Sequence, residues 1–306
     1  MAHAHSTKLF GRFWAGLLSA AALAWPSHAQ DHAAPIPDFA GLWARMTFGA
    51  EPPASGPGPL VNLMHRADGA ADGGKLVGDY NNPILKPAAA AEVRRQGEIS
   101  KTGNAFPDPS NQCAPQQPPF ILRQQEIQLL QEKDQVTILY MLDHHVRHVR
   151  LNSSHPRRVT PSWSGDSIGH YEGDALVVDT VGMKIGPVSM SDQYGSPQSA
   201  AMHVVERYRL VDEETVERAF AQNEKEFGRA DGPIGNGVFV DFDYKGKGLQ
   251  LQFMVEDPNV FTTPWSATVT YRKAGSQWQE QVCAENTFEY YAAKETSVPR
   301  ANKPDF

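Results

Sequence analysis

Short runs of β-forming residues, separated by a few polar or turn-forming residues, follow one another from residue 119 onward. The gaps between these runs leave no room for the helical crossovers that a parallel α/β sheet needs. The spacing therefore predicts an all-β fold, an antiparallel barrel or sandwich. The runs lie at residues 127–130, 136–142, 146–151, 167–172, 175–180, 202–210, 238–244, 249–255, 265–271 and 278–283.

The segment before these runs has a different composition. Residues 30–118 are rich in Pro, Gly and Ala, and the stretch EPPASGPGP at 51–59 excludes regular structure. We expect an irregular N-terminal arm with one short helix near residues 88–96 and a first strand that begins near Trp43. The sequence thus predicts a barrel domain at 119–306, with a polar, Gly-rich loop at 222–237.

Residues 1–29 have the three parts of a secretory signal peptide. Lys8 and Arg12 precede an uncharged run rich in Ala and Leu, and Ser27-His28-Ala29 offers a cleavage site. The run is too short to span a bilayer of ~30 Å. We therefore predict export to the periplasm or the medium, with cleavage near Ala29, and no membrane insertion.

The charge of the chain limits its partners. The full sequence has 28 Lys and Arg residues against 35 acids. Loss of the leader removes two of the basic residues and brings the net charge to about −9. An acidic chain without basic clusters argues against nucleic acid or an anionic membrane as partner. A small-molecule ligand or substrate remains the expected partner.

Cys113 and Cys283 are the two cysteines of the chain. In an oxidising compartment they are expected to form a disulfide, although two separate thiols are the alternative that spacing cannot exclude. The sequence has no P-loop, no dinucleotide fingerprint and no CxxC, so no cofactor is expected.

Gly165 to Gly169 fits the G-x-S-x-G pattern of serine hydrolases, with Ser167 as the nucleophile. That pattern needs a strand before the serine and a helix after it. Here Gly173-Asp174 lies between two β-forming runs, which predicts a two-residue hairpin turn instead. We therefore expect that Ser167 lies on a strand and is not a nucleophile.

Glu206 is the carboxylate that is hardest to place on a protein surface. On an alternating strand it shares a face with Met202, Val204, Tyr208 and Leu210, which predicts that it points inward. A buried carboxylate is either paired with a cation or a candidate acid/base group, and both alternatives stay open. His203 and Arg207 fall on the opposite face, so His203 and Glu206 cannot share a metal ion.

The predicted hairpin places His170, Glu172 and Asp179 on one face, with His170 diagonal to Asp179. Two outcomes are open. Either this face is exposed to solvent, or it lines a cavity in which His170 is a base oriented by Asp179.

A cluster of His and Arg residues at 144–158 is too extended for one zinc ion and too basic for a cation site. We therefore expect no metal site. Arg147 and His155 fit the binding of a carboxylate or phenolate better than that of a metal, and a solvated charged surface is the alternative.

Six motifs together resemble a large family of exported bacterial proteins of mostly uncharacterised function, with a lipocalin-like look. They are DPSNQC at 108–113, HP at 155–156, GDSIGHYEGDALVVDT at 165–180, MHVVERYR at 202–209, DPNVFTTPW at 257–265 and CAEN at 283–286. The resemblance covers about two thirds of the chain after residue 29, and residues 222–248 depart from it. It implies a lipocalin-like barrel and adds Asp166, His155, Glu206 and Glu285 as residues to test.

These observations favour an exported barrel that encloses a small apolar or aromatic molecule and performs cofactor-independent acid/base chemistry, as an isomerase, lyase or hydratase. The base would be Glu206 or His170, and the acid Asp166 or Tyr208. Substrate contacts would come from Arg207, Arg147, His155, His203 and Asp179. The alternatives are a binding protein without turnover, then a serine hydrolase through Ser167, then a carbohydrate-active protein.

Overall fold

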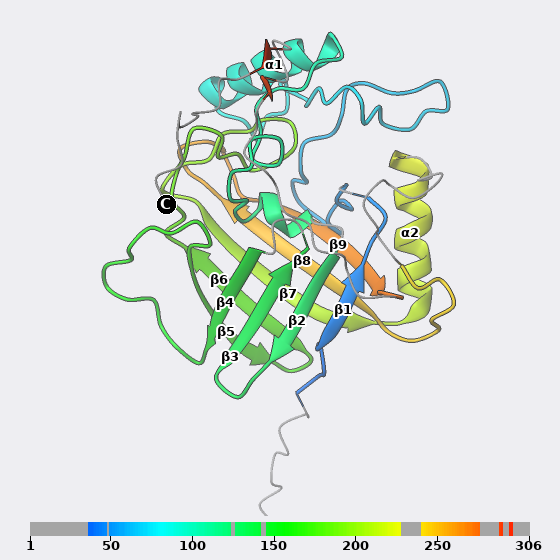
Figure 1. Ribbon diagram of the computed structural model, residues 1–306, viewed down its shortest axis with the longest axis vertical. Coiled ribbons are helices and arrows are strands. Elements are labelled where there is room, and N and C mark those ends of the chain that lie inside the picture. The colour runs from blue at the N-terminus through cyan, green and yellow to red at the C-terminus, as the bar shows by residue number, and fades with distance from the viewer. Residues whose placement is uncertain are drawn as a thin grey trace, which may run out of the picture. The chain divides into compact units, whose positions relative to one another are not determined.

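The computed structural model describes residues 36–47, 49–123, 126–141, 145–227, 240–275, 288–289 and 294–295. Strands β1 to β9 form a closed barrel in which each strand pairs with the next along the chain and β9 pairs with β1 (Figure 1). The predicted all-β barrel is therefore confirmed. The strands are β1 (Gly41–Ala44), β2 (Glu126–Gln131), β3 (Gln135–Tyr140), β4 (His145–Leu151), β5 (Asp166–Glu172), β6 (Ala175–Val181), β7 (His203–Val211), β8 (Gly248–Glu256) and β9 (Trp265–Lys273). The short strands β10 (Phe288–Glu289) and β11 (Lys294–Glu295) pair with each other.

One pairing differs from the purely antiparallel arrangement that the spacing predicted. β4 and β5 are parallel, with Val149 opposite Ser167, and residues 152–165 carry the chain back from the end of one strand to the start of the other. These residues form no helix. A crossover does not require a helix, so the absence of a helical pattern there did not exclude a parallel pair. The barrel is therefore mixed.

The β5–β6 hairpin has the predicted register. Glu172 lies opposite Ala175, His170 opposite Val177, and Ile168 opposite Asp179. Leu176 and Val178 are buried in the core of the barrel, whereas His170 is exposed. The apolar face of the hairpin is thus the inner one, and the face that carries His170 and Asp179 is the outer one.

The N-terminal arm contributes to the barrel. β1 lies within the segment predicted to be irregular, and it closes the barrel between β2 and β9. Trp43 is 3 % exposed and donates its indole N–H to the carbonyl of Phe39 over 2.8 Å. The first strand near Trp43 is confirmed, and a domain boundary at residue 118 would cut a strand off its sheet. The arm also pairs with the barrel through Glu51 and Thr268.

The described residues contain two α-helices, of which the sequence predicted one. α1 (Pro87–Lys101) includes the expected residues 88–96 and continues for a further turn. α2 (Glu213–Phe227) was not predicted. It begins after Asp212, whose carboxylate accepts the backbone N–H of Thr215 over 2.8 Å as an N-terminal cap. α2 packs against β9, with Val216 and Ala219 buried (Figure 1).

Two other predictions near α2 were wrong. Residues 222–227 belong to α2 rather than to a loop. The sequence also predicts a hairpin between the runs at 238–244 and 249–255. The described residues 240–244 of the first run do not pair with β8: Val240 makes a single bridge to Ala274, and β8 pairs with β7 and β9 instead. Residues 1–29, 228–237 and 278–283, together with Glu285, lie outside the described residues.

The 3₁₀ helix η1 (Phe120–Arg123) plugs the end of the barrel at which β9 begins. Ile121 and Leu122 are each 1 % exposed and belong to the barrel core. The hydroxyl of Tyr271, on the inner face of β9, donates to the carbonyl of Leu122 over 3.2 Å. Residues of the covering segments, such as Leu60 and Val93, belong to the same buried cluster.

The disulfide between Cys113 and Cys283 remains a prediction, because Cys283 lies outside the described residues. Closing so long a loop should stabilise the folded chain by roughly 4–5 kcal/mol on the chain-entropy model. Thiol titration of the exported, unreduced and denatured protein should then find no free thiol. Two reactive thiols per chain would rule the bond out.

Candidate functional site

The inner face of the barrel carries one polar group of residues, here called the interior network. Arg147 on β4 and Glu206 on β7 face each other inside the barrel, and their side chains are 1 % and 0 % exposed. Both terminal nitrogens of Arg147 donate to Glu206, with Nη1 to Oε2 at 3.0 Å and Nη2 to Oε1. This is the bidentate geometry that makes an arginine–carboxylate pair strong. The prediction that Glu206 points inward is confirmed.

The other members of the interior network complete the hydrogen bonding of the pair. The guanidinium of Arg147 also donates to Ser167 from Nε (3.0 Å), to Tyr140 from Nη1 (3.1 Å) and to Thr180 from Nη2 (2.8 Å). All five of its N–H groups thus have acceptors. Tyr208 donates its hydroxyl to Oε2 of Glu206 over 2.7 Å. The ion pair therefore enters the core with its hydrogen bonds satisfied, which is the condition under which such a pair is tolerated.

Protonation in the interior network follows from this arrangement. Burial opposes the charge of Arg147, but the facing Glu206 carboxylate together with Tyr140 and Tyr208 outweighs it, and the pKa of Arg147 is held well above its usual value. Burial and the same carboxylate raise the pKa of Tyr208 well above its usual value. Arg147 is thus a fixed cation and Tyr208 a fixed neutral donor at any physiological pH. A tyrosine held protonated in this way is poorly suited to exchange protons with a substrate.

Ser167 belongs to the same network. It is the second residue of β5, and β5 is followed by the hairpin and β6 rather than by a helix. Its hydroxyl is bonded to Nε of Arg147 and to Oγ1 of Thr180 at 2.9 Å. A serine nucleophile needs a base to take its proton, and a guanidinium cannot take one. These contacts agree with the prediction that Ser167 is not a nucleophile.

A second polar group, here called the outer-face chain, crosses the five strands β4 to β8 on the outside of the barrel. His155, in the β4–β5 crossover, bonds Asp166 through Nδ1 (2.5 Å) and Asp179 through Nε2 (3.1 Å). His203 on β7 bonds the same oxygen of Asp179 through Nε2 (2.9 Å). The chain ends in Arg150, paired with Asp166 at 2.9 Å, and in Glu256, 3.5 Å from His203 Nδ1.

The outer-face chain brings together His155, His203, Asp166 and Asp179, which the sequence had proposed separately. A carboxylate can only accept hydrogen bonds, so each ring nitrogen that bonds Asp166 or Asp179 is the donor in that contact. Basic and acidic residues thus alternate along the chain, and His155 ties the crossover to β5 and β6. No three His, Cys, Asp or Glu side chains within the described ranges are placed to hold a metal ion.

Two further predicted site residues, His170 and Arg207, lie elsewhere on the outer face, where both contact Glu172. His170 and Glu172 interact with each other at 2.8 Å, and Arg207 pairs with Glu172 at 2.6 Å. His170 is half exposed and does not meet Asp179, which bonds His155 and His203 instead. Of the two outcomes that the sequence left open for this face, exposure to solvent is the one observed, because the face that carries His170 and Asp179 is the outer face of the barrel.

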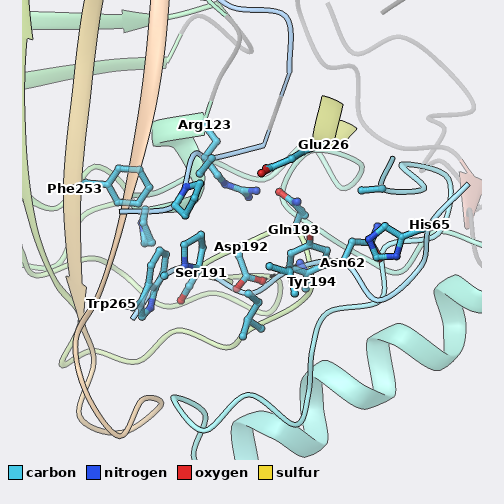
Figure 2. A pocket seen from close by; sticks show the side chains of 18 of the residues that line it. Asn62, His65, Arg123, Ser191, Asp192, Gln193, Tyr194, Glu226, Phe253 and Trp265 are labelled. Atoms are coloured by element: carbon cyan, nitrogen blue, oxygen red, sulfur yellow. Dashed lines mark hydrogen bonds between the residues drawn. The ribbon is translucent and has the colours of Figure 1, made fainter. Parts of the chain in front are cut away.

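A cavity of about 650 Å³ lies outside the plugged end of the barrel, and we call it the mouth cavity (Figure 2). Phe253 on β8 and Trp265 on β9 form one part of its wall, with their rings 6.0 Å apart in an edge-to-face arrangement. Other parts of the wall come from the arm at residues 50–71, from η1, from residues 191–194 between β6 and β7, and from the end of α2. The volume lies within the range of small-molecule sites.

Buried side chains of several kinds meet in the wall of the mouth cavity. Leu60, Phe253 and Trp265 are at most 5 % exposed and make one region of the wall apolar. Tyr194 is also buried, and burial raises its pKa to about 12, so it is a neutral phenol. His65, by contrast, lies at the exposed rim of the wall.

The sequence did not single out any residue of the mouth cavity. None of the nine residues proposed for catalysis or substrate contact belongs to the wall. The wall residues come from irregular segments and element ends, where no alternating pattern shows which side chains meet. Trp265 begins a run that the sequence predicted as a strand, and nothing in that run indicated that Trp265 would line a cavity together with the arm.

Comparison of the chain with models of known protein families, with curated proteins and with solved structures finds no match. The candidate site is therefore argued from its geometry alone. Among the described residues, no helix combines the length and the apolar character needed to cross a membrane.

We predict that Glu206→Gln destabilises the protein by about 3–5 kcal/mol, because it leaves the buried Arg147 cation without a counter-charge. Chemical denaturation of the purified variant measures this. Glu172→Gln is the matched control: it removes an exposed carboxylate from an outer-face pair that solvent screens, so stability should stay nearly unchanged. The double variant Arg147→Met/Glu206→Met should recover part of the loss. A Glu206→Gln protein with unchanged stability would show that the pair is not structural.

The outer-face chain predicts a pH-dependent stability. The hydrogen bond to Asp179 raises the pKa of His203, so its contribution is complete below 6.5 and is lost as pH rises through the folded-state pKa. The hydrogen bond from His203 lowers the pKa of Asp179, and that contribution is lost as pH falls well below 3.8. His203→Gln should therefore cost up to about 1 kcal/mol near pH 5–6 and less near pH 9.

Thermal melts of both proteins between pH 4 and pH 9 test this prediction. His148→Gln is the control, because the His148 ring is bonded to Thr137 rather than to a carboxylate. A loss of stability in His203→Gln that is the same at every pH would contradict the charge alternation in the outer-face chain.

Proposed function

We propose that the protein is an exported binding protein that holds a small, largely apolar or aromatic molecule in the mouth cavity. The observation that carries the proposal is the cavity itself. It has the volume of a small-molecule site, an aromatic wall from the barrel strands, and a covering of chain segments from the arm and α2. Inside the barrel, η1 plugs one end and the interior network fills part of the space.

The position of the predicted catalytic residues favours binding over turnover. The lyase, isomerase or hydratase suggested by the sequence relied on Glu206 or His170 as the base. The carboxylate of Glu206 accepts hydrogen bonds from Arg147 and Tyr208 inside the barrel, and His170 is on the outer face. Neither lines the mouth cavity. The side chains of Glu206 and His170 therefore could not exchange protons with a molecule held in that cavity.

Export is part of the proposal and depends on the leader-like residues 1–29 together with the two cysteines. The resemblance to an exported bacterial family points the same way and remains a prediction. An exported protein with an apolar cavity has an evident use, which is to hold a poorly soluble molecule outside the cytoplasm. We therefore place the protein in the periplasm or the medium.

We expect the protein to bind pyrenemethanol, an uncharged aromatic probe that fits the volume of the mouth cavity. Fluorescence anisotropy of the probe measures binding. Ala71 lines the cavity, and its backbone N–H rather than its side chain is bonded to Glu226. Ala71→Phe should fill part of the cavity and weaken binding about tenfold or more, that is by at least ~1.4 kcal/mol.

Ala200→Phe is the matched control, because Ala200 is exposed and is not part of the cavity wall. It should bind the probe like the unmodified protein. Equal binding by Ala71→Phe and Ala200→Phe would place the probe elsewhere. If none of the three proteins, including the unmodified one, binds the probe, the proposed function is refuted.

A further inference from the structure

The charged groups of the mouth cavity occur as opposite pairs. Within the wall, Arg123 and Asp192 are 8 % and 6 % exposed. Lys225 and Glu226, adjacent at the end of α2, form the second pair at the exposed rim. Figure 2 shows Arg123 and Asp192 beside the same cavity, one from η1 and one from the segment between β6 and β7.

Each buried charge of the first pair is held in place by the fold. Oδ1 of Asp192 accepts the backbone N–H groups of Tyr194 (2.8 Å) and Ser196 (3.2 Å), which fixes the carboxylate. The guanidinium of Arg123 lies 5.2 Å from the ring centre of Phe120. Burial lowers the pKa of Arg123, and the charge of Asp192 is the strongest of those that oppose this shift. One positive and one negative group thus lie in the buried part of the same wall.

A charged ligand gains little in such a site. Its ion would leave water for a largely apolar cavity and would meet a wall whose buried charges already cancel. An uncharged aromatic molecule loses no ionic hydration and gains the full burial of its rings against Phe253 and Trp265. One polar group on such a molecule can still interact with the dipole that Arg123 and Asp192 create.

We infer that the mouth cavity selects uncharged aromatic molecules, and that the balance between Arg123 and Asp192 sets this selectivity. The inference rests on the proposed function and adds the class of ligand and the two residues that determine it. It predicts that removal of either charge changes which ions the cavity accepts, while affinity for an uncharged molecule changes little.

The first experiment compares three probes that share one ring system on the unmodified protein at pH 7. These are pyrenemethanol, pyrenecarboxylate and pyrenemethylammonium, and fluorescence anisotropy gives each dissociation constant. Pyrenemethanol should bind at least about tenfold more tightly than either ion. Equal or tighter binding of one of the ions, lost in Ala71→Phe, would overturn the inference and leave the proposed function standing.

The second experiment removes one buried charge at a time. Asp192→Asn keeps the Oδ1 acceptor for Tyr194 and Ser196 and removes the buried negative charge of the wall, so binding of pyrenecarboxylate should tighten about tenfold. Arg123→Gln should instead tighten binding of pyrenemethylammonium. In both variants the affinity for pyrenemethanol should stay within about threefold of that of the unmodified protein.

Glu226→Gln is the matched control, because it removes a charge from the exposed rim, where solvent screens it. It should change the affinity for each probe less than about threefold. If Asp192→Asn and Arg123→Gln fold and change the affinity for the ions no more than Glu226→Gln does, the assignment of selectivity to the buried pair is wrong. If either variant fails to fold, the comparison of the three probes on the unmodified protein decides the question.

Discussion

The bidentate ion pair between Arg147 and Glu206 is the interaction on which the inside of the barrel depends. Its members come from β4 and β7, which are not neighbours in the sheet, so the pair links opposite parts of the barrel wall. Neither charge could stay buried without the other. Tyr140, Tyr208, Ser167 and Thr180 complete the hydrogen bonding and make the pair part of the core rather than a reactive centre.

That arrangement determines where a ligand can bind. The hydrogen-bonded ion pair fills part of the barrel interior, and η1 plugs one end of the barrel. Both features reduce the room for a ligand inside the barrel. Space for a ligand arises instead where the arm, the β6–β7 segment and α2 meet the plugged end. On the proposed function, the interior of the barrel provides stability and the mouth cavity outside the plug provides ligand recognition. The buried Arg123 and Asp192 repeat the principle of paired charges in the wall of the mouth cavity.

Patterns that depend on neighbouring residues could be predicted from the sequence. Alternation along residues 202–210 placed Glu206 inside and His203 outside, and Gly173-Asp174 fixed the register of the β5–β6 hairpin. α2 was missed because its acidic first turn and polar surface resemble a solvated loop, although Asp212 is a recognisable cap. The outer-face chain and the mouth cavity could not be predicted, because their members approach only after the barrel closes and the crossover and arm fold back onto it.

The parallel β4–β5 pair shows the same limit. Nothing local distinguishes residues 152–165 from an ordinary loop, yet this crossover carries His155 to Asp166 and Asp179 on the outside of the barrel. The sequence had selected these residues one by one, as candidate acids, bases and ligand contacts. Their common role became visible only when the closed barrel placed them in a row across adjacent strands. The residue types alone suggested a catalytic or binding role, whereas the fold shows that His155 fastens the crossover to β5 and β6.

Hydrogen–deuterium exchange with and without saturating pyrenemethanol tests the central claim most directly, since it reports where on the chain the molecule binds. The account predicts slower exchange at residues 50–71, at residues 191–194 and at the end of α2, with the β4–β5 crossover unchanged. Slower exchange confined to the crossover and to the strands that carry Arg147 and Glu206 would contradict it, because the ligand would then be bound by the groups to which we assign a structural role.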